Sequence, residues 1–162
     1  MERATMPATP DRGDRIPDFT APTADGATLR SRDLYLRRNL ALAFTHGPDC
    51  AACRELLRGL ARQVGAARAQ VGQIVAVVPA SPEAATTLAL ELDLGFPVVA
   101  DADLAVHRRY GLAGPDDDAR AALFVTDRYG IVFDASVADA AHRMMAPAEV
   151  PGWLEFVACR CS

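Results

Sequence analysis

The sequence predicts an α/β fold in which a central mixed β-sheet carries helices on both faces. Two short apolar runs, Leu40–Phe44 and Gln73–Pro79, have the length and composition of buried strands, and a segment with helical spacing follows each of them. Two strands joined by a helix are expected to lie parallel in one sheet. Ala121–Thr126 and Ile131–Ala135 flank a short turn, and so short a connection makes these two strands antiparallel.

The length of 162 residues indicates one domain with enough chain for a substantial core, which we place at residues 14–158. Residues 1–13 are predicted to be a flexible lead. Residues 159–162 form a short tail that contains two cysteines.

An N-terminal β-hairpin is expected before the first buried strand. Ile16–Thr20 and Ala27–Arg30 are predicted to be extended, and Asp25-Gly26 between them is typical of a hairpin turn. Ser31 is then expected to cap a short helix that ends at Tyr35.

A long helix is predicted from Arg54 to about Ala69. Gly59 and Gly65 each weaken it by roughly 1 kcal/mol relative to alanine, and we expect neither to stop it. The later helices are delimited by capping residues and glycines: Ser81 and Gly95, then Asp101 or Asp103 and Gly111, and finally a helix over Pro151–Ala158.

Composition excludes several classes of protein. Apolar residues make up 51% of the chain, which excludes a disordered protein, and no apolar run is long enough to cross a bilayer. All 17 basic residues are arginines scattered among 21 acidic ones, so we expect no nucleic acid and no membrane as partner. The polar N-terminus lacks the apolar core of a signal peptide, so we expect a cytoplasmic protein, in which thiols stay mostly reduced.

Residues 45–54 carry the candidate chemistry. An apolar strand leads into a Gly-Pro turn, and Cys50 and Cys53 follow at the start of a helix. Cysteines three apart can close a small disulfide ring, and the free N–H groups and positive dipole end of the helix favour the thiolate. We therefore assign Cys50 and Cys53 as catalytic. The residues expected to support them lie in the turn before them: Thr45, His46 and Pro48.

The order of strand, turn, cysteine pair and helix resembles the thioredoxin-fold superfamily. Further segments resemble its alkyl hydroperoxide reductase/thiol-specific antioxidant (AhpC/TSA) branch, the peroxiredoxin-like redoxins: Gly13–Phe19, Phe96–Asp101 with Tyr110-Gly111, and Phe124–Asp127 with Gly130. The resemblance covers nearly the whole chain from Gly13. It implies a thioredoxin-like sandwich with the N-terminal hairpin as an extension, and a thiol-dependent oxidoreductase.

The site departs from the peroxiredoxin pattern Pro-x-x-x-Thr/Ser-x-x-Cys. Cys53 falls at the place of the peroxidatic cysteine, Cys50 at that of the Thr/Ser, and His46 at that of the proline. Arg120 is one residue out of register with the arginine that orients peroxide in that family, and Ala121 takes its place. The thioredoxin-type C-x-x-C matches directly, but the proline that precedes the thioredoxin hairpin strand is missing.

Three functions stay open at this point. The favoured one is a thiol–disulfide oxidoreductase in which Cys50 attacks a substrate disulfide and Cys53 resolves the mixed disulfide. Its alternative is a thiol peroxidase in which Cys53 attacks peroxide, Arg120 helps to orient it, and Cys50, Cys159 or Cys161 resolves the sulfenic acid. The third is a non-enzymatic module in which all the cysteines together form a structural zinc site with four sulfur ligands.

For the two enzymes we assign no cofactor and no metal ligand. The expected electron donor is a thioredoxin-like protein or a low-molecular-weight thiol, and the expected substrate is a protein disulfide or a peroxide. A homodimer is left open. His107 and His142 have no partners at ligand spacing and are read as ordinary core or surface histidines.

Overall fold

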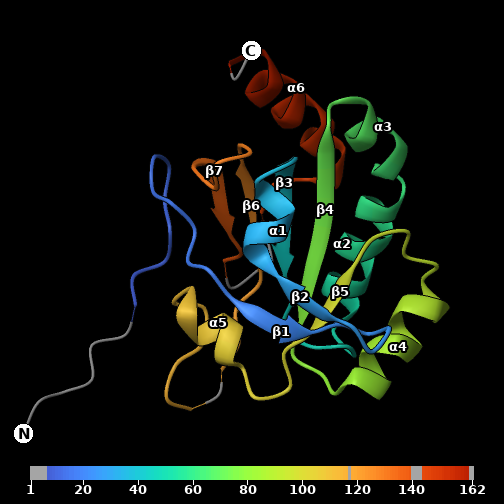
Figure 1. The fold of residues 1–162 in the computed structure, drawn as a ribbon. Helices are drawn as coiled ribbons and strands as arrows, with labels where there is room; N and C mark the ends of the chain where they lie inside the picture. Colours follow the sequence, from blue (N-terminus) through green and yellow to red (C-terminus); the bar gives the residue numbers. More distant parts are fainter. Residues whose placement is uncertain (1–6, 117, 140–143, 161–162) are drawn as a thin grey trace, which may run out of the picture.

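A five-stranded mixed sheet runs through the centre of the molecule, in the order β5-β4-β3-β6-β7 (Figure 1). The computed structural model describes residues 7–116, 118–139 and 144–160. The strands of the sheet are β3 (Asn39–Phe44), β4 (Gly72–Val78), β5 (Val98–Ala100), β6 (Ala122–Thr126) and β7 (Val132–Val137). β3, β4 and β5 are parallel, whereas β6 is antiparallel to both β3 and β7. The predicted α/β fold class is confirmed.

Helices cover both faces of this sheet, as predicted. They are α1 (Ser31–Tyr35), α2 (Ala51–Ala61), α3 (Val64–Ala69), α4 (Pro82–Glu91), α5 (Ala105–Arg109), the short 3-10 helix η1 (Pro147–Glu149) and α6 (Val150–Arg160). α2, α3, α4 and α6 pack on one face, and α1 and α5 pack on the other together with the N-terminal hairpin (Figure 1).

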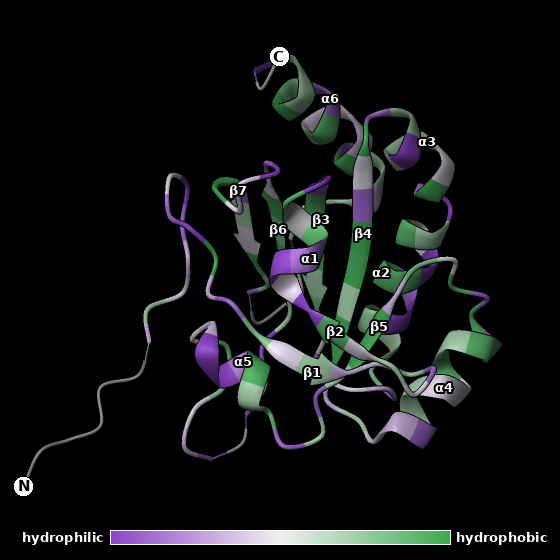
Figure 2. Ribbon diagram, in the orientation of Figure 1, coloured by the Kyte–Doolittle hydropathy of each residue, from purple (hydrophilic) through white to green (hydrophobic). Residues whose placement is uncertain are grey.

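The central strand β3 separates two apolar cores. Because side chains alternate along a strand, Ala41 and Ala43 face α2 and α6, while Leu40, Leu42 and Phe44 face α5 and the hairpin. Every residue of β3 is buried, which explains why the strand is apolar without alternation. Figure 2 shows the hydrophobic colour concentrated on the inner strands of the sheet.

The predicted N-terminal hairpin is present, with β1 (Thr20–Pro22) paired antiparallel with β2 (Thr28–Arg30). The limits predicted for its first strand were wrong, because we expected Ile16–Thr20 and the paired residues begin only at Thr20. Gly26 adopts a φ of +85° in its turn. Ser31 does not cap α1, because it is the first residue of that helix. Its Oγ instead accepts a hydrogen bond from the backbone N–H of Phe19 at 2.9 Å, which attaches the segment before the hairpin to the helix after it.

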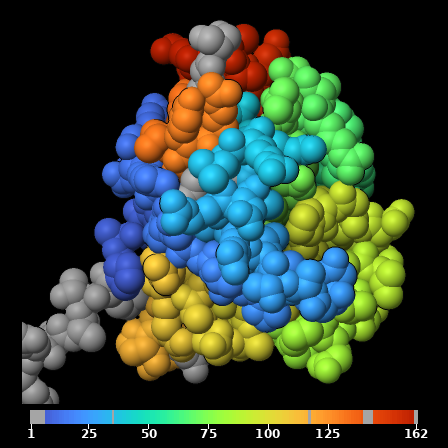
Figure 3. Space-filling model, viewed as in Figure 1, coloured from blue at the N-terminus to red at the C-terminus, as the bar shows by residue number. Residues whose placement is uncertain are grey.

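Residues 9–13 lie at the end of the segment that we expected to be a flexible lead, and they contact the domain. Thr9 Oγ1 donates to the carbonyl of Gly111 at 3.2 Å, and the Gly13 N–H donates to the carbonyl of Val132 at 2.8 Å. Figure 3 shows this segment, in dark blue, against the side of the molecule.

The limits predicted for the long helix after Cys53 were wrong. It starts at Ala51 and divides into α2 and α3, because the chain makes a tight turn in which the Gln63 N–H donates to the Leu60 carbonyl at 2.9 Å. The turn redirects α3 so that Ala67 is buried against β4. Packing against the sheet therefore determines the break.

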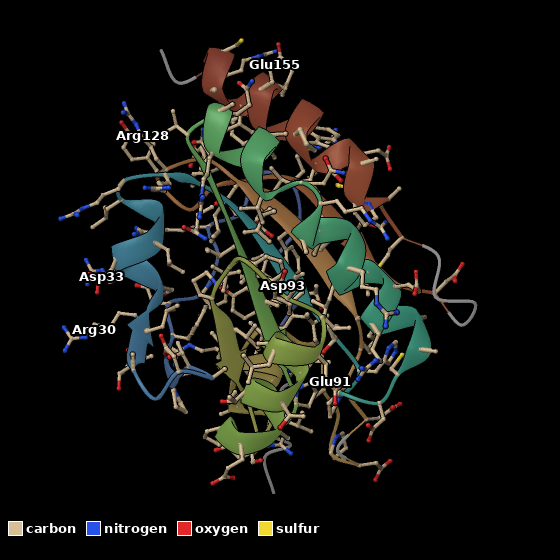
Figure 4. All side chains as sticks on the ribbon, turned by 90° about the vertical axis from the view of Figure 1, so that its right-hand side faces the viewer. Arg30, Asp33, Glu91, Asp93, Arg128 and Glu155 are labelled. Atoms are coloured by element: carbon tan, nitrogen blue, oxygen red, sulfur yellow. The ribbon has the colours of Figure 1, made fainter. Side chains whose placement is uncertain are left out.

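The end of α4 also differs from the prediction. Ser81 caps its start as expected, with the Ser81 Oγ accepting from the Ala84 N–H at 3.1 Å. The helix ends at Glu91, before the expected Gly95, and Asp93 takes the left-handed conformation there with a φ of 50°. Figure 4 shows Glu91 and Asp93 at this end of the helix. Aspartate tolerates this conformation better than most residues, so glycine is not required.

Candidate active site

The two cysteines lie where β3 ends and α2 begins, as the sequence predicts. Cys50 is the N-cap of α2, and its Sγ accepts a hydrogen bond from the backbone N–H of Cys53 at 3.3 Å. Cys50 is half-buried, whereas only 2% of Cys53 is exposed. Both are free thiols. Of the two sulfurs, that of Cys50 is therefore the better placed for a substrate.

His46 contacts both cysteines. Its backbone N–H donates to Cys53 Sγ at 3.2 Å, and its ring Nδ1 lies 3.3 Å from the same sulfur. The same Nδ1 is 3.9 Å from Cys50 Sγ. The predicted supporting role of His46 therefore has a geometric basis, because one ring nitrogen is within reach of either thiol.

The environment of Cys53 keeps it protonated. Burial raises the pKa of the Cys53 thiol to about 12, since the thiolate would lose its hydration there. Hydrogen bonds from the backbone N–H groups of His46 and Gly47 oppose this increase, and the neighbouring Cys50 adds to it. At neutral pH, Cys53 is consequently a thiol and a poor nucleophile.

A buried polar pair supports the turn from the other face of the sheet. His107 Nε2 donates to the backbone carbonyl of Thr45 at 2.9 Å, and His107 Nδ1 lies 2.6 Å from Asp101 Oδ2. Burial raises the pKa of Asp101, but the hydrogen bonds from His107 and from the Val106 N–H outweigh it and leave that pKa lowered. The pair fixes the point at which the chain leaves β3.

His107 was expected to be an ordinary core or surface histidine, and this role was not predicted. Its partner Thr45 is 62 positions away, and only the pairing of β3, β4 and β5 brings them together. The Thr45 side chain was expected to support the cysteines, yet its Oγ1 is buried and has no hydrogen-bond partner within the described part of the chain. The carbonyl of Thr45, rather than its hydroxyl, anchors the turn.

Arg54 is a second supporting residue that sequence reasoning missed. Its Nη1 donates to the carbonyl of Pro48 at 3.0 Å, and its Nη2 forms an ion pair with Glu91 Oε2 at 2.6 Å. It thereby connects the Gly47-Pro48 turn to the end of α4. In the sequence, this role is indicated by the position of Arg54 directly after Cys53, where a long side chain can reach back to the turn. Pro48 supports the site through this carbonyl.

An apolar hollow of about 220 Å³ lies beside Cys53. The side chains around it come from α2, from the residue before β6, from the residue after β7 and from the segment before α6. They include Ala52, Cys53, Leu56, Ala121, Met145 and Pro147. Ala121 lies against Cys53 in the same small cluster. Arg120, which we expected to support the site, is exposed and does not line the hollow, whereas the next residue, Ala121, does.

Cys159, which is the tail cysteine within the described residues, does not lie at the site. Cys159 lies in the last turn of α6, and the neighbouring Ala158 borders a hollow with Asn39 and Val71, at the edge where β3 and β4 begin. Cys50 follows the opposite end of β3, so a strand of about 20 Å separates the two edges. This arrangement argues against Cys159 as a resolving cysteine or zinc ligand within one chain. Cys161 and His142 lie outside the described residues.

The family model described as AhpC/TSA matches residues 12–135, which include both cysteines and the hairpin. The chain belongs to the AhpC/TSA family. It is accordingly a thiol-dependent oxidoreductase, as the resemblance implied. No curated protein matches the chain. No helix in residues 7–116, 118–139 and 144–160 has the length and apolar character needed to cross a membrane.

Solved structures show the same fold at low sequence identity. AhpC of Enterococcus faecalis has a TM-score of 0.81 and 16% identity, with 95% of this chain and 98% of that chain covered. The peroxidoxin BcpB of Mycobacterium tuberculosis has a TM-score of 0.79 and 15% identity, with 94% and 99% covered. Peroxiredoxin Q of Xanthomonas campestris has a TM-score of 0.75 and 16% identity, with 86% and 91% covered. These likenesses establish the thioredoxin-like fold.

Proposed function

We propose that this AhpC/TSA-family oxidoreductase exchanges thiols and disulfides through Cys50 and Cys53, and that Cys50 attacks first. One observation carries the proposal. Cys50 is half-exposed at the N-cap of α2, whereas burial raises the pKa of Cys53 to about 12. An attacking cysteine has to be accessible and able to ionise, and a resolving cysteine only has to reach the first sulfur.

In the first step, the Cys50 thiolate attacks one sulfur of a substrate disulfide. A Cys50–substrate mixed disulfide forms, and the other substrate sulfur leaves as a thiolate. The Cys53 N–H, which donates to Cys50 Sγ at 3.3 Å, and the start of α2 both stabilise negative charge on the attacking sulfur.

In the second step, Cys53 attacks the Cys50 sulfur of the mixed disulfide. The Cys53 thiol must lose its proton first, and His46 Nδ1 at 3.3 Å is placed to accept it. The Cys50–Cys53 disulfide forms and the second substrate sulfur leaves as a thiolate. The cysteines have then lost two electrons to the substrate. A thioredoxin-like protein or a low-molecular-weight thiol would return them.

Single-cysteine variants test this order. In metal-free protein that carries Cys159→Ser and Cys161→Ser, the further change Cys50→Ser should abolish reduction of a disulfide-linked peptide. Cys53→Ser should still release one equivalent of peptide thiol and then stop as a mixed disulfide. The parent with only the two tail substitutions is the control and should turn over. A Cys50→Ser variant that reduces the peptide as fast as this control would refute the proposal.

A thiol peroxidase with Cys53 as the peroxidatic cysteine is the second candidate. Two observations favour it: membership of the AhpC/TSA family and the apolar hollow beside Cys53. In that reaction Cys53 would take one peroxide oxygen as a sulfenic acid, and Cys50 would then displace water to form the disulfide. Cys50→Ser should then still consume one equivalent of peroxide, and Cys53→Ser should consume none.

A further inference from the structure

Three side-chain atoms of metal-binding type converge at the start of α2. His46 Nδ1 lies 3.3 Å from Cys53 Sγ and 3.9 Å from Cys50 Sγ, and all three atoms lie within 4.8 Å of one another. In the described part of the chain, this is the one such group of histidine, cysteine or acidic side chains. The atoms come from the turn after β3 and the first turn of α2, so the fold sets their spacing.

These separations suit a tetrahedral zinc ion. With Zn–S bonds of about 2.3 Å and Zn–N bonds of about 2.0 Å, a nitrogen and a sulfur ligand lie about 3.5 Å apart and two sulfurs about 3.8 Å apart. The two measured distances from His46 Nδ1 to sulfur fall on either side of the first value. Small rotations of the side chains therefore suffice to direct all three atoms at one centre.

The surroundings of the sulfurs also suit bound thiolates. The His46 N–H donates to Cys53 Sγ and the Cys53 N–H donates to Cys50 Sγ, and hydrogen bonds of this kind orient and stabilise metal-bound sulfur. Two thiolates balance the charge of Zn²⁺. Because His46 and Cys50 are only half-buried, a fourth ligand from solvent can reach the ion, as in zinc sites with three protein ligands.

We propose that the reduced protein binds one Zn²⁺ ion through His46 Nδ1, Cys50 Sγ and Cys53 Sγ, with the fourth position open to water or to a thiol. Binding displaces the proton of each thiol. A low-molecular-weight disulfide that oxidises the pair takes two electrons from the cysteines, leaves as two thiols once it has gained two protons, and expels the ion. Zinc and the Cys50–Cys53 disulfide therefore exclude each other.

The experiment is a zinc titration of reduced, metal-free protein, in competition with a coloured chelator and under anaerobic conditions. All variants carry Cys159→Ser and Cys161→Ser, so that the tail cysteines cannot contribute. The background protein should bind one Zn²⁺, and His46→Ala, Cys50→Ser and Cys53→Ser should each bind at least about tenfold more weakly. Oxidation by the low-molecular-weight disulfide should release the ion. Co²⁺ used as the probe should give the absorption of a tetrahedral ion with thiolate charge-transfer bands.

Circular dichroism shows whether each variant is folded, and Arg120→Ala is the matched control because Arg120 is exposed and does not line the hollow beside Cys53. The proposal is overturned if the background protein binds no zinc, or if His46→Ala binds it as tightly as the background does. Zinc binding is measured without a disulfide substrate, and disulfide exchange is measured in the presence of EDTA. Either result can therefore fail without the other.

Discussion

At the scale of single residues, the central feature is the different burial of two cysteines three positions apart. The N-cap position leaves Cys50 half-exposed, and the first turn of the helix directs Cys53 into the apolar cluster with Ala121 and Ala138. The same short motif thus contains one accessible sulfur and one buried sulfur. Their roles follow from this difference in environment.

The raised pKa of Cys53 predicts its reactivity towards alkylating reagents. In a protein whose only cysteine is Cys53, alkylation should remain slow at neutral pH and increase only in strongly alkaline solution. Loss of Cys50 removes a smaller contribution to the raised pKa, and burial remains. The rate of iodoacetamide modification against pH is the measurement. A midpoint near the ordinary cysteine value of about 8.5 would show that burial does not control Cys53.

The same raised pKa predicts a change of stability with pH. Below about pH 8.5 the thiol is protonated in both folded and unfolded chains, so its contribution is fully present. As the pH rises towards the folded value of about 12, the unfolded chain ionises first and the contribution is lost. The unfolding free energy in urea should therefore fall over this range, and Cys53→Ala should remove that part of the fall. An equal slope in the variant would contradict the prediction.

His46 predicts a change confined to the second step. His46→Ala removes Nδ1, which lies 3.3 Å from Cys53 Sγ, but keeps the backbone N–H that donates to the same sulfur. Release of the second substrate thiol should slow by about a hundredfold, because a positioned general base is lost. Release of the first thiol should change little. Stopped-flow detection of thiol release separates the steps, and equal slowing of both would assign His46 to the attack by Cys50 instead.

At the scale of elements, the position of α2 depends on its packing against η1. A β-carbon at Gly59 would lie 2.6 Å from Pro147 Cγ and 2.9 Å from Pro147 Cβ. Pro147 also lines the hollow beside Cys53. Glycine at this position therefore lets the segment before α6 approach the helix that carries the cysteines.

Two glycine-to-alanine substitutions test this contact. Gly59→Ala should lower the unfolding free energy by about 1–3 kcal/mol, because the new methyl group collides with Pro147. Gly65→Ala is the matched control in α3, where nothing lies within 4 Å of the new methyl group. It should raise the unfolding free energy by up to about 1 kcal/mol, because alanine is the better helix former. Urea denaturation measures both, and stabilisation by both substitutions would show that the contact with Pro147 is unimportant.

At the scale of the whole molecule, the site depends on three parallel strands being in register. Asp101 follows β5, and Thr45 follows β3. His107, in α5, contacts the Asp101 carboxylate through one ring nitrogen and the Thr45 carbonyl through the other. The connection is buried. The turn that presents the cysteines is therefore fixed from the opposite face of the sheet.

Asp101→Asn should disrupt this connection, whereas Asp103→Asn should not. Asp101→Asn removes a buried charge that is paired with His107, and it should lower the unfolding free energy by about 3–5 kcal/mol at pH 7. Asp103 is exposed, and its carboxylate accepts a hydrogen bond from the Ala105 N–H, so its substitution should lower the unfolding free energy by about 1 kcal/mol or less. Because the folded pKa of Asp101 is lowered, its contribution is present above about pH 3.9 and is lost as the pH falls through the folded value. Urea denaturation at a series of pH values measures the unfolding free energy. Equal decreases in Asp101→Asn and Asp103→Asn would contradict the prediction.

Local sequence predicted the features that depend on neighbouring residues. Buried strands were predicted at Leu40–Phe44 and Gln73–Pro79 because these runs are apolar almost throughout. A strand that is covered on both faces has this composition. Cys50, Cys53 and His46 were recognised because one turn of chain contains all three. The Ser81 cap was predicted for the same reason.

Features determined by packing between distant segments could not be predicted in this way. Asp101 and His107 gain their role only when β5 lies two strands from β3. The end of α2 is set by the burial of Ala67 against β4, and the exposure of Arg120 by the register of β6. The Ser31 hydroxyl accepts a hydrogen bond from Phe19, in the segment before the hairpin. It therefore does not cap α1, which has no side-chain cap.

The most direct test of first attack by Cys50 is to identify the cysteine that carries the first covalent adduct. Reduced, metal-free protein with the two tail cysteines replaced is mixed with one equivalent of a disulfide-linked peptide, or with one equivalent of hydrogen peroxide. It is quenched within milliseconds and analysed by peptide mass spectrometry. We predict a mixed disulfide on Cys50 that accumulates in Cys53→Ser and does not form in Cys50→Ser. Rapid formation of an adduct or of a sulfenic acid on Cys53 in Cys50→Ser, at the rate of the parent, would contradict first attack by Cys50.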